Sequence, residues 1–206
     1  MSAPGDPFLR RQILGLAASV FPGLPVGIAP VDGVSLKPEE EGALAGAVPA
    51  RRAEFSAGRA AARMALGREV ALPMGPDRAP VWPPGVRGSI THAGGWALAV
   101  VGPGLTGIDL ERDEDLPEEV RETVLLPGER GVDGRTARLI FSAKECAYKA
   151  QYPVTKQLFG FETFAIDLGE GVFRAVWQRD VGPFRAGQAL EGRFAIGAGF
   201  ILTGIG

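Results

Sequence analysis

Glycine and proline constrain this chain more than any other feature of its sequence. The 206 residues include 30 glycines and 17 prolines, and both types interrupt regular elements, so helices and strands should be short and well separated. Between these breaks, the apolar pattern predicts helices over 38–48, 51–67, 117–126 and 134–152. It predicts strands over 96–101, 107–111, 164–168, 173–178 and 193–202. Because helices and strands do not alternate regularly, an α+β fold is expected.

Size and composition limit the class of protein. A chain of this length forms one domain or two of about 100 residues each. Cys146 is the only cysteine, so no internal disulfide can form, and a reducing, cytoplasmic location is expected. The sequence has no run of about 18 apolar residues, so no membrane span is expected. The net charge of −2 argues against a nucleic-acid binder.

The first candidate site is the acidic pair in the segment GIDLE, residues 107–111. On a strand, Asp109 and Glu111 point to one face while Ile108 and Leu110 point to the other. Neighbouring carboxylates are unfavourable unless a cation lies between them, and Mg²⁺ is the cation that one or two carboxylates typically bind. A solvent-facing edge strand would also carry such a pair, so this motif alone leaves both interpretations open.

The second candidate is the segment FSAKECAYK, residues 141–149. On a helix, Phe141, Glu145 and Lys149 share a face, and Lys144 lies beside them. The segment is otherwise apolar, as in a mostly buried helix, so its charges need neutralising partners. A metal for Glu145 and phosphates for the lysines would supply them, whereas an exposed i,i+4 ion pair is the simpler alternative. We interpret Cys146 as a small buried residue.

The third candidate is the segment SITH, residues 89–92, between a loop and a predicted buried strand. A hydroxyl, the imidazole of His92 and backbone N–H groups at such a turn suit a phosphate. A lone histidine is more often structural, so this segment carries little weight alone. The sequence contains no GxxxxGK[ST] motif, so a Walker-type phosphate site is not indicated.

Read in order, the three segments resemble the signature of the Sfp-type phosphopantetheinyl transferases: an S-x-[ST]-H turn, then G-[IV]-D-[ILV]-E, then [FW]-[ST]-x-K-E-x-x-x-K. The details are most similar to the subgroup typified by the enterobactin-synthase phosphopantetheinyl transferase. Further similarity lies in RRAEF (51–55) with Gly58-Arg59, in PVWP (80–83), in KAQYP (149–153) and in GFILT (199–203). The resemblance thus spans residues 40–204, and FSAKECAYKA is its most specific motif.

The resemblance implies a fold of two similar α+β halves, related by a pseudo-two-fold axis, with coenzyme A in the cleft between them. It assigns residues 1–105 to an N-terminal half that binds the 3′-phosphate and adenine. Residues 106–206 form the half with the metal and the catalytic helix. The first forty residues carry no usable motif.

The resemblance also implies roles for individual residues. The metal ligands are Asp109, Glu111 and Glu145, for Mg²⁺ or alternatively Mn²⁺, and the catalytic residues are Glu145, Lys149 and Asp109, with Glu145 as the base for the carrier serine. The coenzyme contacts are Arg51, Arg59, Thr91 and His92 at the 3′-phosphate; Arg78, Ala79 and Pro80 at the adenine; Asp109, Leu110, Lys144, Glu145 and Lys149 around the phosphates; and Phe159 beside the pantetheine arm.

The implied activity is that of a holo-carrier-protein synthase. A monomer would transfer 4′-phosphopantetheine from coenzyme A to a serine of an acyl or peptidyl carrier protein, with release of adenosine 3′,5′-bisphosphate. The subgroup is most often associated with siderophore and nonribosomal peptide synthesis. Residues 124–126 are either apolar carrier contacts or core. The alternative function is a non-catalytic coenzyme A-binding module, which would lack a ligand or phosphate residue.

Overall fold

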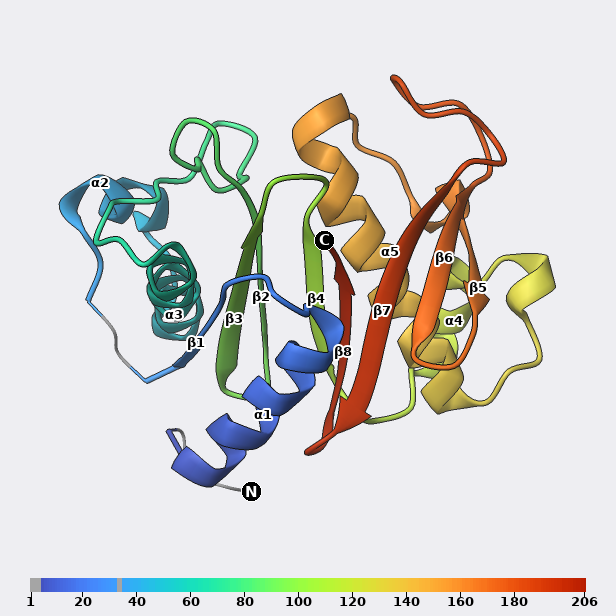
Figure 1. The fold of residues 1–206 in the computed structure, drawn as a ribbon, viewed down its shortest axis with the longest axis horizontal. Coiled ribbons are helices and arrows are strands. Elements are labelled where there is room, and N and C mark those ends of the chain that lie inside the picture. Colours follow the sequence, from blue (N-terminus) through green and yellow to red (C-terminus); the bar gives the residue numbers. More distant parts are fainter. Residues whose placement is uncertain (1–4, 33–34) are drawn as a thin grey trace.

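The computed structural model describes residues 5–32 and 35–206, and its strands form two antiparallel sheets (Figure 1). The smaller sheet has the strand order β1-β3-β2 and the larger has the order β4-β8-β7-β6-β5. The expected α+β architecture of two halves is therefore confirmed. The halves are unequal, however, with three strands in one sheet and five in the other.

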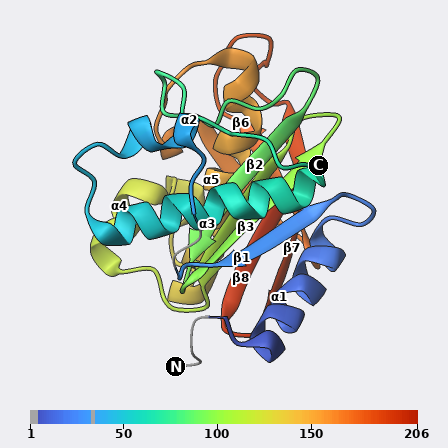
Figure 2. The ribbon, with the colours of Figure 1, turned by 90° about the vertical axis from the view of Figure 1, so that its left-hand side faces the viewer.

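The smaller sheet consists of β1 (Val26–Pro30), β2 (Arg87–Ala93) and β3 (Trp96–Gly102). One long helix, α3 (Pro49–Leu66), lies across its face (Figure 2). The buried side of this helix is made mainly of alanines, which lets the backbones approach closely. A Cβ atom at Gly27 of β1 would collide with the carbonyl oxygen of Ala61, so this position requires glycine.

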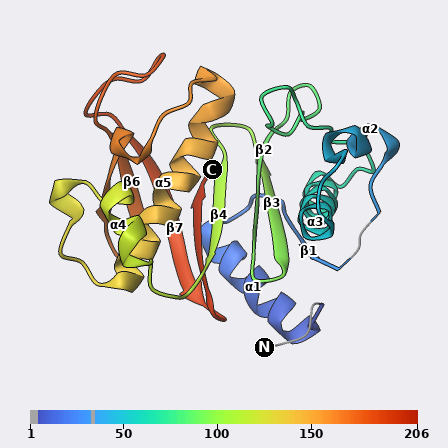
Figure 3. The same ribbon diagram turned by 180° about the vertical axis from the view of Figure 1, so that it is seen from behind.

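The larger sheet consists of β4 (Gly107–Arg112), β5 (Phe164–Leu168), β6 (Val172–Trp177), β7 (Ala189–Gly197) and β8 (Phe200–Ile205). Helix α5 (Gly134–Thr155) packs against it, and α4 (Glu118–Val124) lies beside α5 (Figure 3). Gly107 repeats the close approach seen in the other half, because a Cβ atom there would collide with the carbonyl oxygen of Cys146. Strand β4 is therefore packed directly against α5, the helix that carries the segment FSAKECAYK.

Side-chain hydroxyls join the two sheets where β2 and β4 lie side by side (Figures 1 and 3). The Oγ of Ser89 accepts a hydrogen bond from the backbone N–H of Ile108 at 3.2 Å. Two residues further along, the Oγ1 of Thr91 accepts from the N–H of Leu110 at 3.0 Å. These two hydroxyls satisfy backbone donors that a neighbouring strand would otherwise pair.

Helix α1 (Pro7–Val20) covers the junction of the two sheets and contacts β1, β7 and β8. The carboxylate of Asp6 accepts from the N–H of Phe8 at 2.9 Å and so caps its first turn. Ile13, Ala17 and Val20 are buried in one core cluster with the side chains of Ile108, Leu110, Leu98, Phe200 and Leu202. No helix in residues 5–32 and 35–206 is long and apolar enough to cross a bilayer.

Several predicted boundaries were wrong. The helix predicted over 38–48 is one short turn, α2 (Pro38–Glu41), followed by a 3₁₀ turn (Gly42–Leu44), and Gly46 has a φ of 76° that a helix cannot continue. The strand predicted over 193–202 is β7 and β8, joined by a turn in which Ala198 and Gly199 have positive φ. Residues 89–92, expected at a turn, lie inside β2, and the glycine turn expected after them is Gly94-Gly95. Two further 3₁₀ turns are Pro127–Glu129 and Phe161–Thr163.

Candidate functional site

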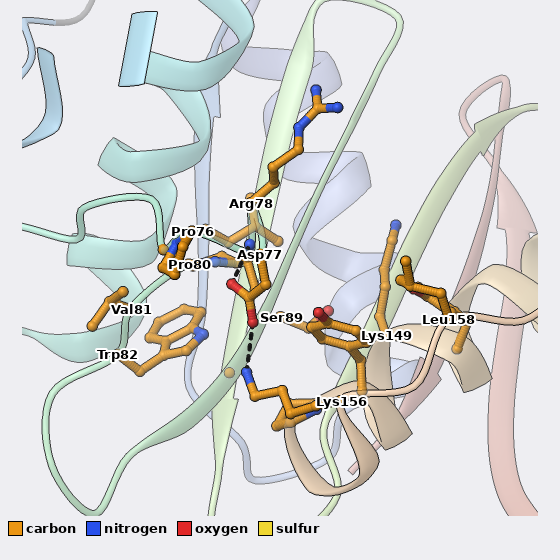
Figure 4. A pocket seen from close by; sticks show the side chains of 17 residues that line it. Pro76, Asp77, Arg78, Pro80, Val81, Trp82, Ser89, Lys149, Lys156 and Leu158 are labelled. Atoms are coloured by element: carbon orange, nitrogen blue, oxygen red, sulfur yellow. Dashed lines mark hydrogen bonds and ion pairs between the residues drawn. The ribbon is translucent and has the colours of Figure 1, made fainter. Parts of the chain in front are cut away.

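A cavity of about 600 Å³ lies between the two halves. One wall is the loop of residues 75–82 together with β2, and the other is the C-terminal part of α5 (Figure 4). Its lining includes the predicted adenine segment Arg78-Ala79-Pro80 and the predicted phosphate ligand Lys149. Segments that are far apart in the sequence therefore enclose a space large enough for a small ligand.

A second cavity, of about 250 Å³, shares Tyr148 with the first as a lining residue. Its other lining residues are Lys144, Glu145, Phe159, Gly160, Phe161 and Phe164. The ring of Phe159 packs edge-on against Tyr148, with 5.3 Å between centroids, and lies below the Arg179 guanidinium at 5.7 Å. This cavity is thus narrow, largely aromatic, and has one acidic group on its wall.

Asp109 is the centre of the polar network beneath these cavities. Its Oδ1 accepts from Lys149 Nζ at 2.5 Å and from Thr91 Oγ1 at 3.3 Å, and its Oδ2 accepts from Ser142 Oγ at 2.9 Å. Burial would lower the pKa of Lys149, but the charge and the hydrogen bond of Asp109 outweigh it and raise that pKa. Lys149 therefore stays positively charged at neutral pH.

The two other predicted acids have raised pKa values. Burial, and then the charge of Asp109, raise the pKa of Glu111 to about 7, although Arg138 opposes the shift and donates to Glu111 at 3.0 Å. Burial also raises the pKa of Glu145; Lys149 opposes this and Asp109 adds to it. Glu145 has no hydrogen-bonding partner among the described residues, so its carboxylate is free to accept a proton.

The three acids do not form a compact ligand cluster. Nowhere in residues 5–32 and 35–206 do three His, Cys, Asp or Glu side chains lie close enough together to hold a metal ion. The electrostatics nevertheless couple them, since the charge of Asp109 raises the pKa of both Glu111 and Glu145. Repulsion among hard oxygen ligands is the condition that a divalent cation relieves, so the donor set fits magnesium in chemistry.

A basic cluster lies where α3 meets β2. Glu54 is 3.7 Å from Arg51 and 3.8 Å from the Nε2 of His92. Burial lowers the pKa of His92, although the charge of Glu54 opposes this. Arg59 lies deeper: its Nε donates to the carbonyl of Leu72, and burial lowers its pKa to about 10, which keeps it charged at neutral pH.

Comparisons with known proteins agree with this geometry. The 4′-phosphopantetheinyl transferase N-terminal domain matches residues 39–102, and the 4′-phosphopantetheinyl transferase superfamily matches residues 106–196. The chain is 42% identical to the 4′-phosphopantetheinyl transferase Svp of Streptomyces mobaraensis, over 86% of this chain and 81% of that protein. It is 39% identical to the 4′-phosphopantetheinyl transferase Npt of Nocardia iowensis, over 82% of this chain and 87% of that protein.

The chain belongs to the 4′-phosphopantetheinyl transferase superfamily. It also resembles the enterobactin synthase component D of Shigella flexneri, with 40% identity over 48% of this chain and 54% of that protein. The family and the enterobactin-like subgroup expected from the motifs are confirmed. As a phosphopantetheinyl transferase, the chain is an enzyme.

The structure of this phosphopantetheinyl transferase separates some residues that were expected to act together. Thr91 and His92 were expected in one phosphate site, but they are neighbours on a strand and therefore point to opposite faces. Thr91 is buried against Asp109, whereas His92 is partly exposed beside Glu54. The side chain of Leu110 lies in the core, and its N–H is already paired with Thr91.

Lys144 was expected to assist at the phosphates, but the transferase buries it in an ion pair. Its Nζ donates to Glu129 Oε2 and to the carbonyl of Val124, both at 2.7 Å, and its side chain is 1% exposed. Glu129 also accepts from the N–H groups of Leu126 and Ile166. The pair ties the segment after α4 to α5 and β5. Val124 and Leu125, considered as carrier contacts, are buried core residues.

Sequence reasoning did not single out several residues that shape the site. Tyr148 lines both cavities, Ser142 supports Asp109, and Arg138 supports Glu111. The first two lie inside the conspicuous helical motif, so their position was a usable signal. The Cys146 thiol is fully buried, and burial raises its pKa, which agrees with a packing role.

Proposed function

We propose that this transferase is a holo-carrier-protein synthase, which moves 4′-phosphopantetheine from coenzyme A to a serine of an acyl or peptidyl carrier protein. Adenosine 3′,5′-bisphosphate is the second product. The observation that carries the proposal is the pair of cavities that share Tyr148, one with Lys149 on its wall and the other with Glu145. Coenzyme A also has two unlike ends, a nucleotide and a thiol arm, with the diphosphate between them.

The arrangement of charges supports this reaction. The serine oxygen attacks the phosphorus that bears the pantetheine arm, and a new P–O bond forms. The bond from that phosphorus to the bridging oxygen breaks, and the bridging oxygen leaves with the nucleotide. Glu145 accepts the serine proton, for which its raised pKa is suited. Lys149, kept cationic by Asp109, stabilises the charge that develops on the leaving oxygen.

We further propose that Asp109, Glu111 and Glu145 hold Mg²⁺, or alternatively Mn²⁺. Burial and the charge of Asp109 both raise the pKa of Glu111 and of Glu145, and a bound cation would offset both effects, which supports this ligand set. When bound, the ion would neutralise charge on the diphosphate. The chain itself prepares the ligands: Ser142 and Thr91 fix the orientation of the Asp109 carboxylate through hydrogen bonds.

At the nucleotide end, we propose that Arg51 and His92 contact the 3′-phosphate, with Arg59 adding positive charge beneath them. Arginine suits a terminal phosphate because its planar fork forms two parallel hydrogen bonds. The terminal nitrogens of Arg59 have no hydrogen-bonding partner among the described residues, although the side chain is only 5% exposed. The N-terminal half, residues 1–105, would thus hold the nucleotide, and residues 106–206 would hold the reacting groups.

Intact mass spectrometry tests the proposal. The protein is incubated with coenzyme A, Mg²⁺ and a panel of apo carrier proteins, and we expect one carrier to gain the mass of one phosphopantetheine arm. Glu145→Gln should slow turnover by roughly 10²–10⁴-fold, the range of a general base, and keep most of the coenzyme A affinity. Glu170→Gln, at an exposed turn, is the matched control. Absence of added mass on every carrier would contradict the proposal.

A further inference from the structure

The loop of residues 75–82, which forms one wall of the larger cavity, has a defined shape of its own. The N–H of Gly75 donates to the carbonyl of Ala79 at 2.8 Å, and the N–H of Arg78 donates back to the carbonyl of Gly75 at 2.9 Å. Arg78 has a φ of 66°, and Met74 and Pro80 form an isolated bridge. The loop is therefore a closed turn held by its own backbone hydrogen bonds.

Asp77 uses its two oxygens for different purposes. Its Oδ1 accepts from the N–H of Ala79 at 3.1 Å, inside the loop. Its Oδ2 accepts from Lys156 Nζ at 2.9 Å, across the cavity (Figure 4). One carboxylate thus shapes the loop and ties it to the opposite wall.

Lys156 is positioned by the end of α5. It follows the last helical residue in a left-handed conformation, with a φ of 54°, and its N–H donates to the carbonyl of Tyr152. Its ammonium group also lies 5.0 Å from the centre of the Tyr152 ring, within the range of a cation–π contact. The helix end therefore directs this lysine over the cavity instead of leaving it free in solvent.

The Asp77 carboxylate is ionised throughout the neutral pH range. The hydrogen bond from Lys156, and then the one from Ala79, lower the pKa of Asp77. A lowered carboxyl pKa means that the group stays ionised to more acidic pH than an ordinary aspartate. Protonation does not break the contact under ordinary assay conditions.

We propose that the Asp77–Lys156 pair is a strap across the coenzyme site, which sets the width of the cleft and retains coenzyme A. The inference rests on the proposed function, because it takes this cavity as the coenzyme site. Both residues are positioning residues, since they join the walls of the cleft and act on the ligand through the loop. The pair connects an N-terminal loop to a C-terminal helix, so it limits how far the two walls can separate.

The size of the effect follows from the exposure of the pair. The two side chains are 30% and 58% exposed, and an exposed ion pair changes an equilibrium constant by roughly 1.4- to 5-fold. We therefore expect Asp77→Asn to raise the coenzyme A dissociation rate and the KM for coenzyme A about two- to fivefold. The KM for the carrier protein should not change.

Asp77→Asn is the sharpest variant because its amide oxygen can still accept from Ala79 while the charge is lost. Dissociation is measured by stopped flow with excess competitor, and both KM values are measured by steady-state kinetics. Asp167→Asn, which removes an exposed ion pair with Arg174 on β5 and β6, is the matched control and should behave as wild type. The double variant Asp77→Asn with Lys156→Gln should release coenzyme A no faster than either single variant, because both changes remove the same interaction.

The possible results distinguish failure of the strap proposal from failure of the proposed function. If the wild-type protein binds coenzyme A and Asp77→Asn releases it at the wild-type rate, the strap is overturned but the proposed function is not. Tighter binding in Asp77→Asn also overturns it, because Lys156 would then be a direct ligand that Asp77 restrains. If the wild-type protein binds no coenzyme A, the proposed function itself fails. Faster dissociation in Asp77→Asn, with no further increase when Lys156→Gln is added, supports the strap.

Discussion

The Lys144–Glu129 pair provides the sharpest test of how this protein uses the charges in helix α5. We predict that Lys144→Met destabilises the fold and leaves the coenzyme A affinity of the folded protein unchanged. The reason is that its ammonium group makes both of its hydrogen bonds to Val124 and Glu129; the side chain borders the smaller cavity but not the larger one, and methionine keeps its apolar stem. Its side chain is 1% exposed and that of Glu129 is 7% exposed.

The magnitude follows from the charge that is left behind. Breaking a buried ion pair by removing one partner costs about 3–5 kcal/mol. Glu129 keeps two backbone hydrogen bonds, from Leu126 and Ile166, which stabilise its carboxylate, so we expect the low end, about 3 kcal/mol. Domains of this kind unfold with about 5–15 kcal/mol, so the variant should still fold. Lys144→Met combined with Glu129→Gln removes both charges and should recover part of the loss.

Urea unfolding of the wild type, both single variants and the double variant measures the coupling between the two residues. Calorimetry with coenzyme A on the folded variants measures affinity. The reasoning would be refuted if Lys144→Met lost less than about 1 kcal/mol, the value of an exposed pair. It would equally be refuted if stability held while coenzyme A affinity fell, because the lysine would then contact phosphate.

Three further changes test the fold and the site. Gly107→Ala should cost about 1–3 kcal/mol in urea unfolding because the new Cβ collides with the carbonyl of Cys146; Gly104→Ala, which meets nothing, should be neutral. Asp133→Ala should lower the melting temperature by removing the cap of α5. Hydrogen bonding lowers the pKa of Asp133, so this deficit should be largest at neutral pH and shrink as pH falls through the native pKa, below the ordinary aspartate value, where the capping group loses its charge. Arg51→Ala should weaken coenzyme A binding about tenfold with little effect on dephospho-coenzyme A, and equal losses in calorimetry would contradict the 3′-phosphate assignment.

Local patterns allowed strand β4 to be predicted from the sequence. The alternation in GIDLE placed Ile108 and Leu110 on one face, and both are buried in the core cluster that includes α1. Asp109 lies on the other side, against Ser142 and Lys149. Alternation is a property of the strand itself, so no knowledge of the rest of the fold was needed.

The misplacement of Lys144 has a physical cause. Successive residues on a helix are separated by about 100°, so Lys144 and Glu145 point in different directions, although both belong to one motif. A buried helix needs a partner for a charge on either face, and the partner of Lys144 is Glu129, which lies 15 residues earlier. The sequence pattern shows that a charge must be neutralised but does not show which group neutralises it.

Long-range contacts account for the remaining differences. Asp77 and Lys156 meet across 79 residues, and no local pattern relates them. Helix α1, which lies outside the predicted elements, is capped by Asp6, and its position is set by contacts with β7 and β8, which are neighbours in the larger sheet. The tertiary arrangement determines the Asp77–Lys156 contact and the position of α1. The spacing of residues along the chain predicts neither.

Thr91, at the junction of the two sheets, determines how accurately the two halves are positioned relative to each other. Its single oxygen accepts from the N–H of Leu110 and donates to Asp109, so an atom of the N-terminal half contacts the carboxylate that the proposed reaction uses. Any relative sliding of the halves would disturb that carboxylate at once. Thr91 therefore fixes the relative position of two parts of the site: the part that would hold the nucleotide and the part where bonds would be made and broken.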